Sequence, residues 1–567
     1  MVSWQGMTIS LGRYQELVDQ ALAEMGDQQV VARIWQRDHT VWKPEPEEIT
    51  NRLGWLQSPG VMADSANRLR PFADSVRAEG FTHAVLLGMG GSSLAPEVFR
   101  QTFGVANGFL DLAVLDSIVP GAVLAQARRL DPLRSIFLVS TKSGTTVETI
   151  SLFKFFYNWM ADAVGGAEAG KHFIAITDPG SPLLDIGTRY HFRLGFLNMA
   201  SLGGRYAAIS SVGLVPAALI GMDIGQLLTR AQEMAGQCQP AAAGRGANPA
   251  AVLGAVLAEL AKAGRDKVTF IMSAQIASFS AWLEQLIAES LGKEGKGMLP
   301  VVGEEIGAPD AYGEDRLFVQ LSLEGDATAD APMTALEQAG HPVVRIVLSD
   351  PYDLGGQLFL WEMAVAVAGH RLGVNPFDQP DVEATKRFAR QAVNEYAKKG
   401  ALPAEIPSLM GDGIEVYGKV AIVQPAQALT AFVAQAKPGA YVAFQAFLEP
   451  LPEIDEALQA LRMGLSRRFR LATTRGYGPR FLHSTGQLHK GDAGKGLFVQ
   501  FTADDARDAA IPDEAGAPAS SITFGILKAA EAIGDRKALT KAGRRVIRLH
   551  LGKDAIKGLR RLHAAIR

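Results

Sequence analysis

Apolar residues along this 567-residue chain follow two rhythms. From Leu11 to Met25 they recur at helical spacing, which predicts an N-terminal helical segment over residues 1–75. From residue 81 onward, short and nearly continuous apolar runs alternate with helical stretches. Such runs are typical of strands that are buried on both faces of a parallel sheet. The pattern therefore predicts an α/β protein.

Two α/β blocks are expected, over residues 76–236 and 249–400. The predicted strands of the first block are 84–87, 112–115, 135–140, 173–177 and 192–197. Those of the second block are 268–272, 317–323 and 343–348. Long helices are predicted at 147–163 in the first block and at 277–291 and 357–372 in the second. Each block is therefore expected to be a doubly wound parallel sheet, which binds ligands at the carboxyl ends of its strands.

The remaining segments follow other patterns. Gln237–Asn248 is small, polar and contains Pro and Gly, which indicates a linker or an exposed loop. In the last third, residues 415–567, strands are predicted at 441–447, 471–474, 496–501 and 546–550, with helices at 453–465, 524–542 and 553–566. The order β-α-β-β-α-β favours a small C-terminal α+β domain of the split-βαβ type.

Composition excludes several classes of protein. The net charge of −3 implies no broad basic face and argues against nucleic acid as the main partner. A single cysteine, Cys238, allows neither an intrachain disulfide nor a multi-cysteine metal site, and it fits a reducing compartment. The N-terminus lacks the pattern of a secretory signal, and no apolar run reaches the roughly 18 residues of a membrane span. A cytoplasmic enzyme that does not depend on a membrane is expected.

Two strands of the first block run into turns that are rich in Gly, Ser and Thr. In LLGMGGSSLAP (86–96), Gly90 and Gly91 let the backbone approach an anion, and Ser92 adds a hydroxyl. Taken alone, such a turn is also compatible with a nucleotide site or with a simple tight turn.

The second turn, in FLVSTKSGTTVET (137–149), concentrates hydroxyl groups and one ammonium group at a predicted helix start. These groups belong to Thr141, Lys142, Ser143, Thr145 and Thr146. One N-cap needs only one hydroxyl, so ordinary capping does not account for the crowding. The two turns together predict a small phosphorylated substrate that is held by its phosphate.

Two further elements carry possible catalytic groups. Arg205, in GGRY, stands in a loop before an apolar helix, where a guanidinium could stabilise an oxyanion. Glu289, in AESLGK, lies near the carboxyl end of a helix, where the macrodipole disfavours a carboxylate. The raised pKa that this predicts would suit a general base. Each is also compatible with an ordinary surface residue.

Five motifs follow one another in a fixed order: GMGGSSLAP, STKSGTTVET, GGRY, AESLGK and FDQPDVEATK (377–386). This order resembles phosphoglucose isomerase, whose paired sugar-isomerase (SIS) domains would correspond to the two α/β blocks. The segments RIWQRDHTVW, YGEDRLF and RFLHSTGQLHKG resemble the isomerase half of bacterial transaldolase–phosphoglucose isomerase fusions. Since the chain leaves no room for the transaldolase barrel, the resemblance implies isomerase activity alone.

The resemblance implies roles for individual residues. Glu148 would lie close to the sugar, and Arg205 would stabilise the enediolate. Glu289 would move a proton between C1 and C2, and Lys386 would assist ring opening at the sugar oxygen. The phosphate pocket would be formed by Ser92, Thr141, Lys142, Ser143 and Thr146.

The chain also departs from the family pattern. Ala207 stands where a Ser or Thr is usual, and Pro380 and Asp381 interrupt the last motif. The usual ring-opening histidine is missing from APDAYGEDRLF (308–318), so Asp315, Arg316 or a histidine of the C-terminal domain could take its place. His483 and His489, in HSTGQLHKG, are the candidates. We hypothesise that this segment is a loop that closes over the sugar, although both histidines could equally serve their own domain.

We therefore expect reversible isomerisation of glucose 6-phosphate and fructose 6-phosphate through a cis-enediol(ate), with no metal and no cofactor. The alternatives are a non-catalytic SIS-type sensor of sugar phosphates and an isomerase that acts mainly on mannose 6-phosphate. A sensor would need only the phosphate turns, so the presence of Arg205, Glu289 and Lys386 together favours an enzyme. The expected partner is a hexose 6-phosphate. A homodimer is possible, with the C-terminal domain capping the site or replacing the dimer interface.

Overall fold

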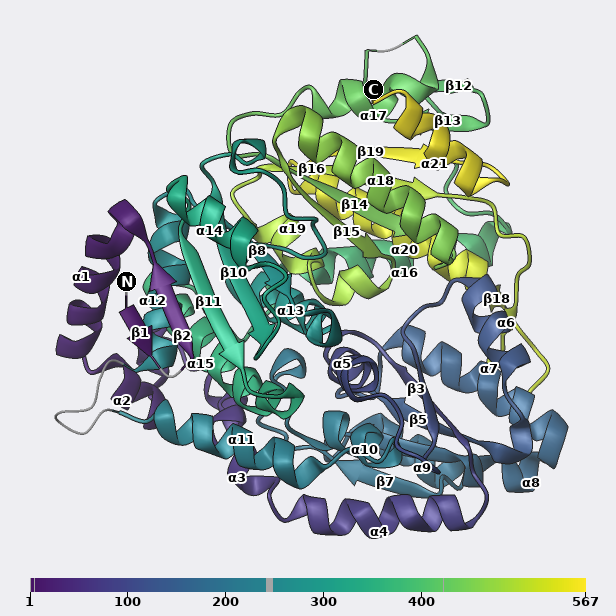
Figure 1. Cartoon of the computed structure of the whole chain (residues 1–567). Coiled ribbons are helices and arrows are strands. Elements are labelled where there is room, and N and C mark those ends of the chain that lie inside the picture. The colour runs from purple at the N-terminus through teal and green to yellow at the C-terminus, as the bar shows by residue number, and fades with distance from the viewer. Residues whose placement is uncertain (1, 5, 241–247, 422, 567) are drawn as a thin grey trace.

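A computed structural model describes residues 2–4, 6–240, 248–421 and 423–566 (Figure 1). Part of the predicted linker, residues 241–247, lies outside the described residues. The first block holds five parallel strands in the order β4-β3-β5-β6-β7. These are β3 (His83–Gly88), β4 (Asp111–Leu115), β5 (Ser135–Ser140), β6 (Phe173–Thr177) and β7 (Leu194–Leu197). The expected doubly wound parallel sheet is confirmed.

Helices cover both faces of this first sheet. Most of these helices pack their apolar side on the buried strands and contribute to two of the hydrophobic clusters of the molecule. The helices are α5 (Leu94–Phe103), α6 (Pro120–Arg129), α7 (Val147–Val164), α8 (Gly166–Ala169), α9 (Pro182–Arg189), α10 (Ser211–Leu219) and α11 (Ile224–Gln237). Helix α11 packs instead on α15 (Leu354–Leu372) of the second block.

The second block repeats the strand order of the first. Its parallel strands run β9-β8-β10-β11, and the N-terminal strand β2 adds to β11 in the antiparallel direction. The strands are β8 (Lys267–Met272), β9 (Leu299–Val301), β10 (Arg316–Leu323), β11 (Val343–Leu348), β1 (Val2–Trp4) and β2 (Met7–Ser10), and the helices are α12 (Pro249–Lys262), α13 (Phe279–Leu291), α14 (Asp330–Gln338) and α15 (Leu354–Leu372). The N-terminal segment is therefore not purely helical. Strands β1 and β2 were not predicted because they are too short to show in the apolar pattern.

The rest of the N-terminal segment is helical, as expected. It holds α1 (Gln15–Asp27), α2 (Val30–Trp35), α3 (Ser58–Val61) and α4 (Ser65–Ala78). Trp55 is fully buried, and its ring lies 5.6 Å from that of Tyr206. Trp42 packs edge-on against Phe377 at 4.9 Å between ring centroids. The segment thus supports the loop that carries Arg205 and the start of the FDQPDVEATK motif.

The C-terminal domain differs from the expected split-βαβ order. Four strands of its main sheet are parallel, in the order β15-β14-β16-β19, and the hairpin β12–β13 adds to β19 in the antiparallel direction. Its strands are β12 (Leu409–Gly411), β13 (Ile414–Tyr417), β14 (Tyr441–Phe447), β15 (Ala472–Tyr477), β16 (Gly496–Thr502) and β19 (Arg545–His550). A third sheet with the strand order of the two blocks thus replaces the α+β domain. The expectation failed because the segment between β15 and β16 is not a simple loop: it contains helix α19 (Gly486–Gly491), which provides a crossover for parallel strands.

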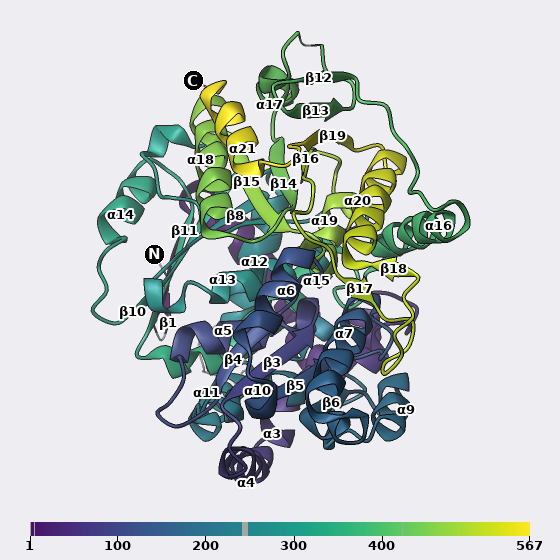
Figure 2. The same cartoon turned by 90° about the vertical axis from the view of Figure 1, so that its right-hand side faces the viewer.

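The other helices of the last third cover the third sheet and join it to the rest. They are α16 (Glu383–Lys399), α17 (Ala428–Val433), α18 (Pro452–Phe469), α20 (Phe524–Lys541) and α21 (Ala555–Ala564). Helix α20 packs along α16, and the hairpin β17 (Ala510–Ile511) and β18 (Ile522–Thr523) lies against α7 (Figure 2). Among the described residues, no helix has the length and apolarity to cross a membrane.

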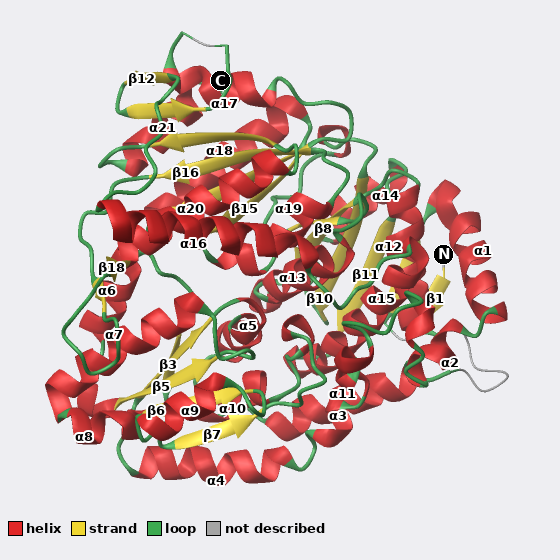
Figure 3. Cartoon of the chain, turned by 180° about the vertical axis from the view of Figure 1, so that it is seen from behind, coloured by secondary structure: helices red, strands yellow, loops and turns green. Residues whose placement is uncertain are grey.

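The three sheets surround a common centre. Helices α5, α13 and α19 lie between them in both the front view and the back view (Figures 1 and 3). Helix α13 contacts α5 of the first block and α19 of the C-terminal domain. The elements that carry the predicted site residues therefore converge where the three domains meet.

Candidate active site

The two Gly/Ser/Thr turns leave the first sheet side by side. Strands β3 and β5 are paired, with Gly88 opposite Ser140, and each turn begins at that end. Gly91, Ser92 and Lys142 line one small cavity together. The predicted phosphate residues of both turns thus meet at the carboxyl edge of the sheet, where α/β sheets bind their ligands.

The hydroxyl groups of the second turn surround the start of α7. The Thr141 and Thr146 hydroxyl oxygens lie 2.9 Å apart, and the Ser143 hydroxyl accepts a hydrogen bond of 3.2 Å from the Thr145 backbone N–H. Ser143 and Thr145 are exposed, whereas Thr141 is buried. The N-terminus of α7 adds backbone N–H groups without helical partners, which favour an anion.

Lys142 is partly neutralised by a carboxylate that the sequence reasoning missed. Its ammonium group forms an ion pair with Asp178 and donates a hydrogen bond of 3.4 Å to the Ala200 carbonyl. Burial raises the pKa of Asp178, and the ion pair with Lys142 only partly offsets this effect. Asp178 and Asn198 line the same small cavity. Their signal was available, since each follows a strand of the first block at its carboxyl end.

The glycines of the first turn allow two other loops to approach it closely. Gly90 has a φ of +53°, and a Cβ there would lie 2.6 Å from the His483 carbonyl oxygen. A Cβ on Gly91 would collide with the Gly204 carbonyl, next to Arg205. The turn therefore serves both for anion binding and as the packing surface for the loops of Arg205 and His483.

Arg205 is buried and held by groups from two segments, α13 and the stretch 376–379. Its Nε donates to the Ser290 hydroxyl at 2.7 Å, and its Nη1 donates to the Gln379 amide oxygen at 3.0 Å. Its Nη2 donates to the backbone carbonyls of Pro376 (2.6 Å) and Asp378 (3.0 Å). This network fixes the guanidinium in one orientation.

Glu289 lies against Arg205 at the carboxyl end of α13. Its Oε1 is 3.4 Å from the Arg205 Nη1, and its Oε2 accepts a hydrogen bond of 3.0 Å from the Gln285 amide. The same amide donates to the His483 carbonyl at 2.8 Å. Gln285 was not predicted, although it precedes Glu289 by one turn of the same helix. It links the proposed base to the segment that carries His483.

His483 forms an ion pair with Glu148 across the domain boundary. The His483 Nε2 lies 2.6 Å from the Glu148 Oε1. Burial acts to lower the pKa of His483, but the negative charge and hydrogen bond of Glu148 outweigh it and raise that pKa. Burial likewise acts to raise the pKa of Glu148, but the His483 charge overcomes it and the pKa is lowered. Both shifts favour the charged forms of the pair, a carboxylate and an imidazolium.

Lys386 lies near this pair. Its positive charge acts on both Glu148 and His483, while its own ammonium group pairs with Glu383 at 2.8 Å. About half of its side chain is exposed, so it stands at the rim of the group. The structure thus brings Glu148, Lys386 and His483 together with Glu289.

The other candidates for ring opening lie apart from this group. His489 is buried in the C-terminal domain, where its Nδ1 is 3.4 Å from the Gln445 amide and its ring packs on Phe498 at 4.9 Å. Burial lowers its pKa well below the usual value. Arg316 pairs with Glu304 at 2.7 Å, and Asp315 pairs with Lys267. Of the four candidates for the ring-opening group, His483 is the one that contacts Glu148.

One departure from the family pattern has a local explanation. The Asp381 backbone N–H donates to the Gln487 amide oxygen at 2.9 Å, and the Gln487 amide donates to the Asp381 carboxylate at 2.5 Å. Gln487 also donates to the Gly292 carbonyl at 3.1 Å, just beyond the end of α13. Asp381 therefore attaches the FDQPDVEATK motif to the segment that carries His483.

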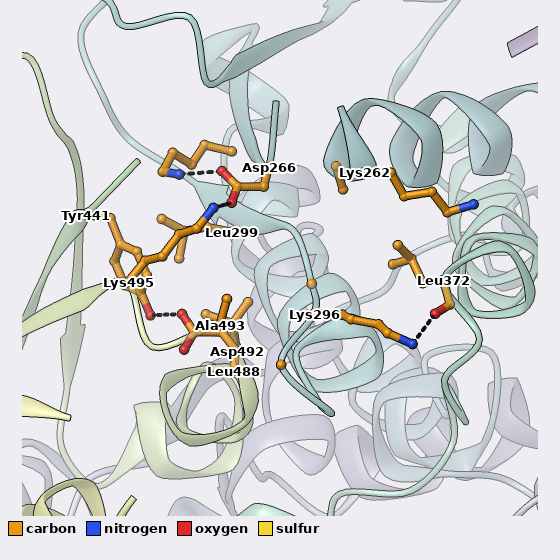
Figure 4. Close-up of a pocket in the computed structure, with 14 residues that line it drawn as sticks. Lys262, Asp266, Lys296, Leu299, Leu372, Tyr441, Leu488, Asp492, Ala493 and Lys495 are labelled. Carbon is orange, nitrogen blue, oxygen red and sulfur yellow. Dashed lines mark hydrogen bonds and ion pairs between the residues drawn. The ribbon is translucent and has the colours of Figure 1, made fainter. Parts of the chain in front are cut away.

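A separate cavity of about 400 Å³ lies between the second block and the C-terminal domain (Figure 4). Its polar groups are occupied: Lys495 pairs with Asp266 at 2.7 Å, and the Tyr441 hydroxyl donates to Asp492 at 2.9 Å. Lys296 donates to the Leu372 carbonyl at 2.8 Å. No predicted site residue lines this cavity. Elsewhere in the described part of the chain, no cluster of three His, Cys, Asp or Glu side chains could hold a metal ion.

Comparison with known proteins agrees with this arrangement. Residues 61–314 match the family model described as phosphoglucose isomerase. The chain is 30% identical over 430 residues to a glucose-6-phosphate isomerase of Geobacter sp. (strain M21), covering 66% of this chain and 78% of that protein. It is 29% identical over 378 residues to that of Rubrobacter xylanophilus, covering 58% and 85% of the two chains.

The fold is shared as well. The crystal structure of a glucose-6-phosphate isomerase from Chlamydia trachomatis aligns with a TM-score of 0.58 at 20% identity, over 70% of this chain and 90% of that one. The family itself follows from the sequence, since the Geobacter isomerase is 30% identical and is matched over 78% of its length. The chain belongs to the phosphoglucose isomerase family.

Proposed function

We propose that this chain interconverts glucose 6-phosphate and fructose 6-phosphate, with Glu289 as the base that moves the proton. The observation that carries the proposal is the convergence of Glu289, Arg205 and the Glu148–His483 pair from three domains. A sensor of sugar phosphates would have no use for a carboxylate set 3.4 Å from a fixed guanidinium. Family membership supports the same aldose–ketose isomerisation.

In this proposal the phosphate binds first, at the two turns of the first block. The backbone of Gly90 and Gly91, the N-terminus of α7 and the hydroxyls around it would hold the anion. Ser92, Thr141, Lys142, Ser143, Thr145 and Thr146 would supply the side-chain contacts. These contacts would direct the sugar toward the centre where the three domains meet.

Ring opening requires an acid for the ring oxygen and a base for the anomeric hydroxyl. His483, charged through its pairing with Glu148, would donate a proton to the ring oxygen, with Lys386 adding positive charge nearby. Glu148 would orient the imidazole. We assign no part in this step to His489, because its ring is buried against Gln445 and Phe498, away from Glu148.

Isomerisation then moves one proton from C2 to C1, while the proton of the C2 hydroxyl passes to the C1 oxygen. Glu289 would take the proton from C2 of the open-chain aldose and return it to C1 of the cis-enediolate. Arg205 would stabilise the negative charge on the intermediate, because its orientation is already fixed by four acceptors. A buried guanidinium that needs no reorganisation is well suited to this purpose.

The test is a coupled assay that measures glucose 6-phosphate formed from fructose 6-phosphate. Wild type should convert the sugar, and Glu289→Gln should lose about 100- to 10,000-fold in kcat while keeping its affinity for the sugar phosphate. Mannose 6-phosphate serves as the comparison substrate. Wild type that binds but does not convert fructose 6-phosphate would support the sensor instead.

We also propose that one copy of the chain completes its own site. Glu148, Arg205, Glu289, Lys386 and His483 all come from the same chain, so a second copy is not needed to supply a catalytic group. A homodimer would then serve another purpose. The buried free thiol of Cys238 fits our proposal that the enzyme acts in the reducing cytoplasm.

A further inference from the structure

A buried carboxyl group of the C-terminal domain faces the Glu148–His483 pair. Glu531, on α20, is 4% exposed, and the next residue, Ala532, packs in one cluster with Phe481 and Leu482, beside His483. The carboxyl group of Glu531 is thereby brought within reach of that of Glu148. Neither oxygen of Glu531 accepts a hydrogen bond from a donor in the described part of the chain. The mechanism above gives this group no role, and an unused buried acid is costly to keep.

Two carboxyl groups in contact inside a protein do not both carry a charge. Glu148 has the stabilising partner, because its Oε1 lies 2.6 Å from the His483 Nε2. Burial, followed by the negative charge of Glu148, raises the pKa of Glu531 well above its usual value. Of the two groups, Glu531 is the one favoured to stay neutral, and a neutral carboxyl group has one O–H to donate.

We propose that Glu531 is a positioning residue for ring opening, donating its carboxylic O–H to Glu148 and so holding that carboxylate in line with His483. The inference rests on the proposed function, in which His483 is the ring-opening acid. The O–H proton stays on Glu531, and no proton transfer through it is required.

The position of α20 supports such a role. Gly534 allows α20 to approach α16 closely, because a Cβ there would lie 2.7 Å from the Ala389 backbone nitrogen. On the same helix, Lys528 pairs with Asp505 at 2.5 Å and Asp535 pairs with Lys490 at 2.6 Å. These contacts fix the helix on both sides of Glu531.

Besides each other, Glu148 on α7 and His483 face two charged groups. These are Lys386 on α16 and Glu289 on α13. Removing the hydrogen bond from Glu531 would leave Glu148 less stabilised as an anion. The pH at which Glu148 takes up a proton should therefore rise.

Three variants separate positioning from packing. Glu531→Leu removes the donor and keeps the bulk, and Glu531→Gln keeps an N–H donor without a titratable group. Asp535→Asn is the control, because Asp535 is a buried acid one turn further along α20 that pairs with Lys490 instead. Thermal melts check that each variant is folded.

Ring opening of cyclic fructose 6-phosphate should slow about 10- to 100-fold in Glu531→Leu, as expected when a hydrogen bond to a charged group is lost. The acid limb of its pH profile should move to higher pH. Glu531→Gln should restore both to within about threefold, since its amide still donates. Asp535→Asn should leave the acid limb in place. Equal rates and pH profiles in wild type and folded Glu531→Leu would overturn the proposal.

A second readout needs no activity. At pH 7 the infrared spectrum of wild type minus that of Glu531→Gln should contain the C=O band of a protonated carboxylic acid, and the Asp535→Asn difference spectrum should not match it. A Glu531 difference spectrum with only carboxylate bands would overturn the proposal. If wild type binds but never isomerises, the proposed function is wrong, while the infrared result still decides the state of Glu531.

Discussion

Replacing His483 by Gln tests the pairing of two groups that are 335 residues apart in the sequence. The wild-type pair has a 2.6 Å contact, with 6% of the Glu148 side chain and 23% of the His483 side chain exposed. Breaking such a buried pair leaves one charge without its partner, which typically costs about 3–5 kcal/mol of folding free energy. The partial exposure of His483 places the expected cost at the lower end of that range.

The cost should depend on pH in a defined window. The pKa of Glu148 is lowered in the folded protein, so its contribution is present above the ordinary value of 4.5 and is lost as the pH falls further. The pKa of His483 is raised, so its contribution is complete below the ordinary value of 6.5 and is lost as the pH rises. The stability difference between wild type and His483→Gln should therefore be largest between pH 4.5 and 6.5.

The kinetic effect should be confined to ring opening. Rapid mixing with cyclic fructose 6-phosphate should show a loss of about 100- to 10,000-fold in His483→Gln, as for removal of a general acid. Exchange of the C2 proton in an open-chain analogue should remain near the wild-type rate. His489→Gln is the matched comparison and should retain ring opening. Wild-type ring opening in His483→Gln, with a stability difference that does not vary with pH, would refute this account of the pair.

Three other results are expected. Ser143→Ala and Thr146→Val should each raise KM about tenfold with little change in kcat, because phosphate contacts persist from ground state to transition state; an unchanged KM in both would place the phosphate elsewhere. Burial raises the pKa of Glu284 to about 7, so the ionised group destabilises the fold at higher pH. Glu284→Gln should therefore raise the free energy of unfolding by up to about 3 kcal/mol above pH 7 and leave it unchanged below pH 4.5. Chemical denaturation across this pH range checks the prediction. Specific activity should stay constant on dilution through any dimer dissociation followed by sedimentation, and a parallel loss of activity would show that a second copy is needed.

Much of the α/β framework could be predicted because buried parallel strands leave continuous apolar runs. Four strands were predicted to the residue, and most others to within one or two positions. The four are Ser135–Ser140, Phe173–Thr177, Val343–Leu348 and Tyr441–Phe447. The direction of the C-terminal strands could not be predicted in the same way. Helix α19 is only six residues long and is rich in Gly, His and Lys, so its sequence is typical of a loop.

The candidate site divides along similar lines. The hydroxyl-rich turn, Arg205 and Glu289 were visible because local sequence places them at strand or helix ends. The contact of His483 with Glu148 depends on how the C-terminal domain sits on the first block, which local pattern does not encode. Glu531 gave no signal at all, since a glutamate in a helix is normally exposed and only the packing of α20 buries it.

The central claim is that one carboxylate, Glu289, carries the proton between C2 and C1 beside Arg205. Its most direct test is the fate of deuterium placed at C2 of glucose 6-phosphate during conversion to fructose 6-phosphate. With wild type, part of the label should appear at C1 and the rest in water, and Glu289→Gln should show neither transfer nor exchange. Transfer of the label to C1 by folded Glu289→Gln at the wild-type rate would contradict the account.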